Sequence, residues 1–154
     1  MVAADFARKD GFDAVSWGHA MSGDAGWSVG AAEGLRVLRG GVAEGRIAGG
    51  CLSILAEGLG TAYAAVRATA EEPRILFLED VGTKPYQWDR MLLHLRYAGM
   101  MEGVTGIVFG DMQKCVAPGE MALLEQALLH ALRDFEGPVA MGLRSGHVLS
   151  LIHI

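Results

Sequence analysis

The sequence predicts an α/β fold built on a largely parallel sheet. Three observations lead to this prediction. Short apolar runs that suit buried strands alternate with longer stretches in which apolar residues recur at helical spacing. Glycines stand at several points where one kind of segment gives way to the next, as turns require. The chain also has ample material for the core of one domain, since hydrophobic residues make up 51% and charged residues 20% of its 154 residues.

The first forty residues are expected to be irregular. They are rich in glycine and show no sustained period, so only short helical pieces are predicted, near residues 3–9 and 15–21. Trp17 and Trp27 in this stretch need an apolar surface to pack against. We therefore interpret residues 1–40 as a wrapping segment rather than a mere linker.

Regular structure is expected from about residue 41. Residues 45–48 predict a short strand, and the Gly-Gly pair that follows permits a tight turn. Apolar residues from Cys51 onward predict a helix that ends near residues 58–60. The Gly-Gly pair lacks the Lys-Ser/Thr of a phosphate loop and the third glycine of a dinucleotide turn, so it is weak evidence for a nucleotide site.

The rest of the chain continues the alternation. The remaining elements are predicted in this order: a strand at 75–78 that is buried on both faces, a helix over 88–98 that Gly99 ends, a strand within 106–110, a helix over 121–132 and a strand at 138–141. Connections of this kind place consecutive strands in a parallel sheet.

Composition excludes several classes of function. A net charge of −5 argues against a general nucleic-acid surface, which needs clustered Lys and Arg. Cys51 and Cys115 give neither a disulfide framework nor a metal-ligand spacing; Cys51 suits a small buried residue, and Cys115 sits in a loop-like stretch where it could be reactive. No secretory signal opens the chain, and no apolar run approaches the ~20 residues that span a bilayer. We expect a soluble cytoplasmic protein without a membrane partner.

Candidate catalytic residues follow the ends of predicted strands. Glu79 and Asp80 end the strand at 75–78, and because neighbours on an extended chain point to opposite sides, only one of them can face a given pocket. Asp111 follows the next strand and could line the same cleft. His147 is the one histidine of five that stands in a glycine-flanked loop after a strand. Loops at the carboxyl ends of parallel strands build active sites.

A carboxylate and an imidazole in this arrangement allow three interpretations. Glu79 could hold the imidazole of His147 in one tautomer, as the acid of a Ser-His-acid triad does. The same pair could form a structural salt bridge, or it could bind a metal ion together with Asp111. Spacing alone does not choose among them, although the chain has no His-Glu-x-x-His motif of the kind that binds zinc.

Five ordered blocks between about residues 43 and 148 resemble the C-terminal domain of the LD-carboxypeptidases, a family of serine peptidases. The family includes the murein tetrapeptide carboxypeptidases and the microcin C self-immunity peptidases. The matching blocks are residues 44–55 with Gly-Gly-Cys, 75–82 with Leu-Glu-Asp-Val-Gly, 85–92, 106–111 with Gly-Ile-Val-Phe-Gly-Asp, and 142–147 with Gly-Leu-Arg-Ser-Gly-His.

The resemblance implies a fold and a set of catalytic residues. It implies a swivelling β/β/α-type domain for residues 41–154, with residues 1–40 as a remnant of an N-terminal domain and its linker. Glu79 and His147 carry over as the glutamate and histidine of a Ser-Glu-His triad. The nucleophile has no counterpart, because no serine here lies in the family's Gly-Tyr-Ser-Asp turn. We therefore expect a fragment altered at both ends and inactive alone; Cys51 stands where many members have Asn.

The implied parent reaction hydrolyses the amide between an L-centre and a C-terminal D-amino acid. The expected substrate is a murein tetrapeptide that loses D-alanine during cell-wall recycling, with no cofactor or metal and with a homodimer as the full-length form. Arg144, Lys84 and Arg90 are weak candidates for binding the substrate carboxylate; for Arg90 and its neighbour Asp89, pairing and capping near a helix start is the simpler interpretation. The alternative function is a non-catalytic α/β domain that binds a peptide or a partner protein.

Overall fold

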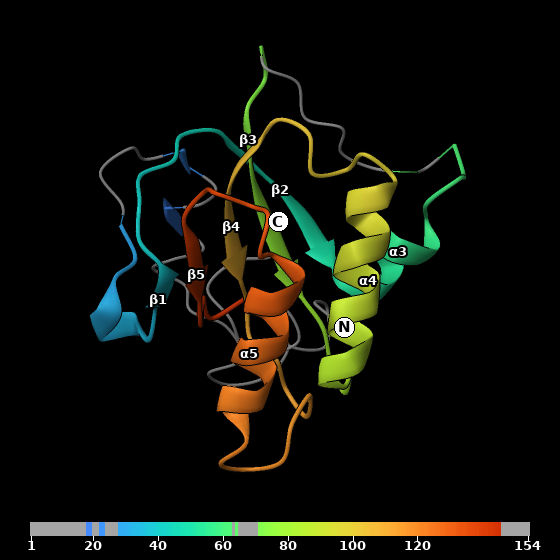
Figure 1. The fold of residues 1–154 in the computed structure, drawn as a ribbon. Coiled ribbons are helices and arrows are strands. Elements are labelled where there is room, and N and C mark those ends of the chain that lie inside the picture. The colour runs from blue at the N-terminus through green and yellow to red at the C-terminus, as the bar shows by residue number, and fades with distance from the viewer. Residues whose placement is uncertain (1–17, 20–21, 24–27, 63, 65–70, 146–154) are drawn as a thin grey trace.

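A five-stranded sheet with three helices packed on it forms most of the described part of the chain (Figure 1). The computed structural model describes residues 18–19, 22–23, 28–62, 64 and 71–145. The strands are β1 (Arg36–Arg39), β2 (Arg46–Cys51), β3 (Arg74–Glu79), β4 (Val104–Phe109) and β5 (Val139–Met141). The helices are α3 (Leu52–Glu57), α4 (Pro85–Tyr97) and α5 (Met121–Ala131), and a 3₁₀ turn covers Ala31–Glu33.

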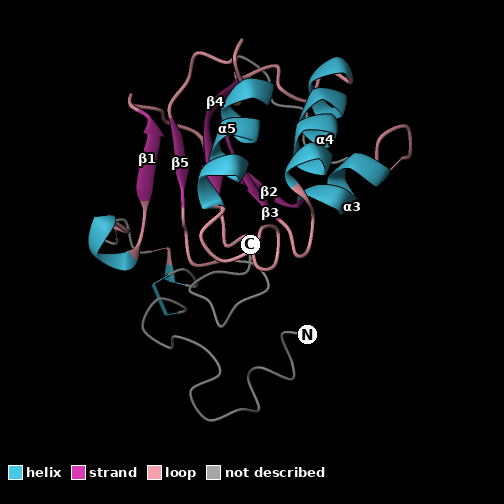
Figure 2. Ribbon diagram, turned by 60° about the horizontal axis from the view of Figure 1, so that its bottom comes forward, coloured by secondary structure: helices cyan, strands magenta, loops and turns pink. Residues whose placement is uncertain are grey.

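The sheet is mostly parallel, as predicted. Its strand order is β1-β5-β4-β3-β2, with parallel pairing from β2 to β5 and an antiparallel β1 at one edge. Each helix joins two strands that are neighbours in the sheet, and right-handed crossovers in one direction place all three helices on one face. Figure 2 shows α4 and α5 side by side in this helical layer.

Strand alternation gives the sheet two different faces. On β3, Leu76 and Leu78 join the core cluster beneath the helices, so Phe77 and Glu79 project from the opposite face. Trp88 of α4 meets Phe109 of β4 edge-on in this core, with ring centroids 5.7 Å apart. The fully buried core side chains come from both layers and include Leu52, Leu78, Leu92, Leu95, Ile107, Phe109, Leu124, Leu128 and Val139.

The expectation of a tight turn at Gly49 and Gly50 is wrong, because both residues lie inside β2. The strand runs on to Cys51, which pairs with Glu79. Gly49 has a φ of 141°, and a Cβ there would lie 1.9 Å from the carbonyl oxygen of Phe77. Glycine thus serves a close approach between two strands here, and not a reversal of the chain.

Irregular structure was expected up to residue 40, yet Arg36–Arg39 form strand β1. Tertiary contacts hold this strand. Arg36 pairs with Glu125 of α5 at 2.6 Å, and Arg39 donates to the carbonyls of Leu132 and Phe135 just beyond α5. Four residues are too few to show a period, and these partners lie far along the chain. The division of the chain at residue 40 stays a prediction, although β1 already belongs to the sheet.

The other elements agree with the sequence, except that strands β3 and β4 are slightly longer than predicted and α4 begins at Pro85, three residues before its predicted start. Gly99 stops α4 with a φ of 75°, and its N–H donates to the carbonyl of Arg96. β3 is buried on both faces, since Leu76, Phe77 and Leu78 are each at most 5% exposed. Within the described ranges, no helix has the length and apolar character needed to cross a bilayer. The expected helical piece at residues 3–9, as well as Trp17 and Trp27, lies outside the described residues.

Candidate active site at the carboxyl edge of the sheet

Glu79 is the last residue of β3 and lies at the carboxyl edge of the parallel strands. Its side chain projects from the face opposite the helices and is 5% exposed. In the parallel pairing it stands beside Cys51, the last residue of β2. Active-site loops leave a parallel sheet at this edge, so the structure places Glu79 where the sequence predicted a functional acid.

The chain that follows β5 returns to this same edge. A Cβ built on Gly110, just after β4, would lie 3.0 Å from the Cβ of Glu79 and 2.9 Å from the carbonyl oxygen of Ser145. The N–H of Asp111 donates to that Ser145 carbonyl at 3.1 Å. Glu79 and Ser145 therefore flank one glycine. His147, two residues after Ser145, lies outside the described residues.

Asp80 has a different environment from Glu79. Its carboxylate accepts the N–H of Ser53 at the start of α3 at 2.9 Å and the N–H of Val81 at 2.8 Å. Both contacts hold the acid on the helical side, which agrees with the expectation that the adjacent carboxylates point apart. Asp80 therefore ties β3 to α3, and Glu79 is the acid that remains for a site on the other face.

Asp111 lies at the same sheet edge but in a neighbouring hollow. It lines a pocket of about 150 Å³ together with Arg36, Gly110, Met112, Met121, Met141 and Gly142. Within the described ranges, no group of three or more His, Cys, Asp or Glu side chains is placed to hold a metal ion. The metal interpretation also invoked His147, which lies beyond those ranges.

All three weak candidates for binding a substrate carboxylate are exposed. Lys84 precedes α4, and its N–H donates to the side chain of Gln87 at 2.8 Å. Arg90 lies on the second turn of α4. Arg144 is the neighbour of Ser145, so of the three it is the one whose backbone lies in the segment beside Glu79.

The two cysteines differ from what was expected. Cys51 is partly exposed, because β2 is an edge strand, and its Sγ lies 3.2 Å from the Ser53 hydroxyl. Cys115 is fully buried, and its thiol contacts the carbonyl oxygen of Asp80. Burial raises the pKa of the Cys115 thiol, with a smaller contribution in the same direction from the Asp80 carboxylate. A neutral buried thiol suits a structural role and not the reactive one that was left open.

Two residues at this edge were not predicted. Gly110 leaves the space in which Glu79 and Ser145 approach each other, and its position directly after a strand was the available signal. Arg36 lines the Asp111 pocket from β1, and because that strand was not predicted, no sequence signal placed Arg36 there.

Comparisons with known proteins identify the family to which this chain belongs. The family model described as "LD-carboxypeptidase C-terminal domain" matches residues 44–152. A "Probable murein peptide carboxypeptidase" of Bacillus subtilis strain 168 is 37% identical over 109 residues, which cover 70% of this chain and 33% of the relative. These matches cover most of this chain but only about a third of the length of the curated relatives.

Solved structures give the same result. The muramoyltetrapeptide carboxypeptidase from Oxalobacter formigenes is 30% identical with a TM-score of 0.56, over 69% of this chain and 36% of that one. An MccF-like protein from Bacillus anthracis is 27% identical with a TM-score of 0.62, over 73% of this chain and 34% of that one. The chain belongs to the LD-carboxypeptidase family, of which it carries the C-terminal domain.

Proposed function

We propose that this chain supplies the acid and the base of a serine-type LD-carboxypeptidase. The reaction is hydrolysis of the amide between an L-centre and a C-terminal D-amino acid, with a murein tetrapeptide as substrate and D-alanine as leaving group. The chain contributes Glu79 and His147, and a serine from a part of the enzyme that precedes the matched residues completes the triad. We place the reaction in cytoplasmic cell-wall recycling, by a homodimer of the full-length protein.

Each group has a defined step in this mechanism. The imidazole of His147 takes the proton of the serine hydroxyl as the oxygen attacks the amide carbon, and it returns that proton to the leaving amine. The carboxylate of Glu79 fixes the tautomer and stabilises the imidazolium. Water, deprotonated by the same imidazole, then cleaves the acyl-enzyme. Backbone N–H groups around the serine would bind the oxyanion, so this chain alone is inactive.

The observation that carries the proposal is the approach of Ser145 to Glu79 across Gly110. Two residues of extended chain reach at most about 7 Å, so a chain that continues from Ser145 can bring His147 within reach of the Glu79 carboxylate. A buried acid beside an imidazole is what the base of a triad requires. The binding of Asp80 by Ser53 and Val81 removes the neighbouring acid from competition for this role.

Arg144 is the candidate for the terminal carboxylate of the substrate. It is exposed, and it lies between the end of β5 and Ser145. An arginine there can bind a carboxylate with two parallel N–H donors. Lys84 precedes α4 and Arg90 lies within it, so both are weaker candidates.

A chimera tests the proposal directly. The part of the Bacillus subtilis relative that precedes the matched region would be joined to this chain at Glu44, where the family match begins. We expect the chimera to release D-alanine from a murein tetrapeptide, whereas the present chain releases none. Both Glu79→Gln and His147→Ala should abolish that activity. Equal activity of the Glu79→Gln chimera would refute the assignment of the acid.

A second measurement needs only the chain itself. The imidazole protons of His147 can be followed by NMR as the pH is changed. A carboxylate in contact stabilises the protonated ring, so Glu79→Gln should make His147 titrate at lower pH, and Asp111→Asn serves as a matched control with a smaller effect. Identical titration curves in the wild type and in Glu79→Gln would show that the two side chains do not meet.

A further inference from the structure

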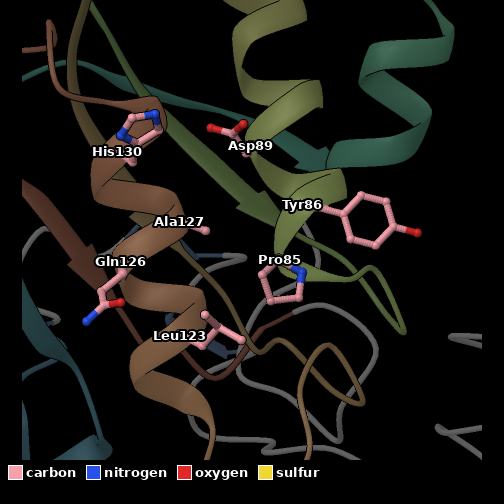
Figure 3. Close-up of a pocket in the computed structure, with 7 residues that line it drawn as sticks. All are labelled: Pro85, Tyr86, Asp89, Leu123, Gln126, Ala127 and His130. Atoms are coloured by element: carbon pink, nitrogen blue, oxygen red, sulfur yellow. The ribbon is translucent and has the colours of Figure 1, made fainter.

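A second concave surface lies in the helical layer, away from the proposed catalytic edge. It is a groove of about 490 Å³ between α4 and α5 (Figure 3). Its lining comes from one face of each helix: Pro85, Tyr86 and Asp89 of α4, and Leu123, Gln126, Ala127 and His130 of α5. Binding sites for small organic molecules occupy roughly 300–1,000 Å³ and are mostly apolar with a few polar groups. The groove has this size and this composition.

The apolar part of the groove is open to solvent. Tyr86 is 67% exposed and Leu123 is 54% exposed, and the two lie on facing helices. Neither residue contributes to the core beneath the helices. Figure 3 shows Leu123 and Pro85 in the space between the helices, whereas the ring of Tyr86 points away from α5. Apolar side chains in such a hollow favour an apolar occupant, because its contact removes their surface from water.

Asp89 is the unusual member of the lining. Its Oδ1 atom is shielded from solvent, and it has no hydrogen-bond partner among the described residues. The described part of the chain also offers it no ion pair, since the salt bridges there involve other acids. The sequence suggested that Asp89 helps to cap a helix, but it is the fifth residue of α4 and lies beyond the first four N–H groups, which are the ones that a cap satisfies. A shielded carboxylate oxygen without a donor is costly.

The polar groups of the groove converge at one end. Figure 3 shows the Asp89 carboxylate in the space between the helices and His130 on the facing turn of α5, with Leu123 and Pro85 farther along. A ligand with a cationic group at one end and an apolar body would pair with the charge of the Asp89 carboxylate and cover Leu123. An anion would be repelled by Asp89, and a purely apolar ligand would leave its charge unpaired.

We propose that the α4–α5 groove binds a small organic cation, with a primary ammonium or guanidinium group at Asp89 and an unbranched or aromatic apolar body along Leu123 and Pro85. The site is independent of the peptidase reaction, because Glu79 projects from the opposite face of the sheet. It would let a metabolite amine bind the domain without entering the catalytic edge.

The test uses two probes of equal length, n-hexylammonium and 1-hexanol, which differ in the cationic group. Binding to the purified chain at pH 8 is followed through the backbone amide NMR signals of α4 and α5. We expect n-hexylammonium to bind at least about tenfold more tightly than 1-hexanol and to shift the signals of both helices. Asp89→Asn should make the two affinities equal. Glu57→Gln, which removes an exposed acid from α3, is the matched control and should keep the tenfold preference.

Leu123→Lys provides a second variant at an exposed position. It brings a competing cation into the groove, so it should weaken n-hexylammonium binding at least tenfold. The proposal is overturned if n-hexylammonium shifts no signal of α4 or α5, or if Asp89→Asn retains the preference for the cation. If Asp89→Asn does not fold, unchanged binding by Leu123→Lys overturns it instead.

Discussion

Glu79 and Asp80 are adjacent and almost equally buried, at 5% and 4% exposure, but they lie in different surroundings. Asp80 faces the helical layer, where the backbone N–H groups of Ser53 and Val81 bind its carboxylate. Glu79 faces the other side, beside Gly110 and the segment that leads to His147. Burial alone therefore does not separate a structural acid from a candidate catalytic acid. The chemical nature of the neighbours does, and each side can be tested by substitution.

The largest expected effect is on catalysis. In the active chimera, Glu79→Gln should lower kcat about 10⁴-fold, as expected when the acid of a triad can no longer orient and stabilise the imidazole. The loss corresponds to roughly 5.5 kcal/mol in the barrier. Steady-state release of D-alanine measures it. Asp80→Asn is the comparison variant, and if it lowered kcat as strongly while Glu79→Gln did not, the two roles would have to be exchanged.

The next effect is on stability and runs the opposite way. Asp80→Ala removes the acceptor of the Ser53 and Val81 N–H groups, so the free energy of unfolding should fall by roughly 2–4 kcal/mol. Glu79→Gln keeps the size of its side chain and should cost less than about 1 kcal/mol. Urea unfolding followed by circular dichroism measures both. A greater loss for Glu79→Gln than for Asp80→Ala would show that Glu79 has the larger structural role.

A third test concerns the contact across Gly110. In Gly110→Ala, the new methyl group would meet the Phe77 ring and the Ser145 carbonyl at 2.9 Å and the Cβ of Glu79 at 3.0 Å. Overpacking of this kind costs roughly 1–3 kcal/mol and should push the segment before His147 away from Glu79. Gly40→Ala is the control, because a Cβ at Gly40 meets nothing within 4 Å. Unfolding curves compare the two, and equal stabilities would mean that the carboxyl edge is looser than the structure shows.

The sequence predicted the parts of the fold that depend on local patterns. The apolar run before Glu79 and the apolar stripe of α4 can be recognised in the sequence, because burial on one or both faces determines their residue types. Strand β1 was not predicted because the side chains that hold it in place, Arg36 and Arg39, contact α5 and the residue just after it, which lie far along the chain. Gly49 was wrongly expected to lie in a turn, because glycine suits both a turn and a close approach of two strands, and in the structure it has the second role with a positive φ.

The candidate site was predictable to a similar degree. The proposal of Glu79, and not Asp80, as the catalytic acid rests on the family resemblance, since periodicity predicts only that the two side chains point apart. One partner of Asp80 is the N–H of Ser53, which is 27 positions earlier in the chain, and so only the folded chain reveals it. The groove beside Asp89 was also invisible in the sequence, because it needs the packing of α4 against α5.

The smallest expected effect probes the Asp80 side through Cys115, whose thiol contacts the Asp80 carbonyl. Burial, and to a lesser extent the Asp80 carboxylate, raises the pKa of this thiol in the folded state, whereas the unfolded chain releases its proton near the ordinary value of about 8.5. The unfolded state therefore binds fewer protons above that pH, and stability should fall as pH rises, by at most about 1.4 kcal/mol per unit. Cys115→Ser should flatten this decline above roughly pH 8.5. Cys51→Ala retains Cys115, so the fall of stability with rising pH should remain in this control variant. A fall that persists in Cys115→Ser would mean that a group other than the Cys115 thiol causes the loss of stability at alkaline pH.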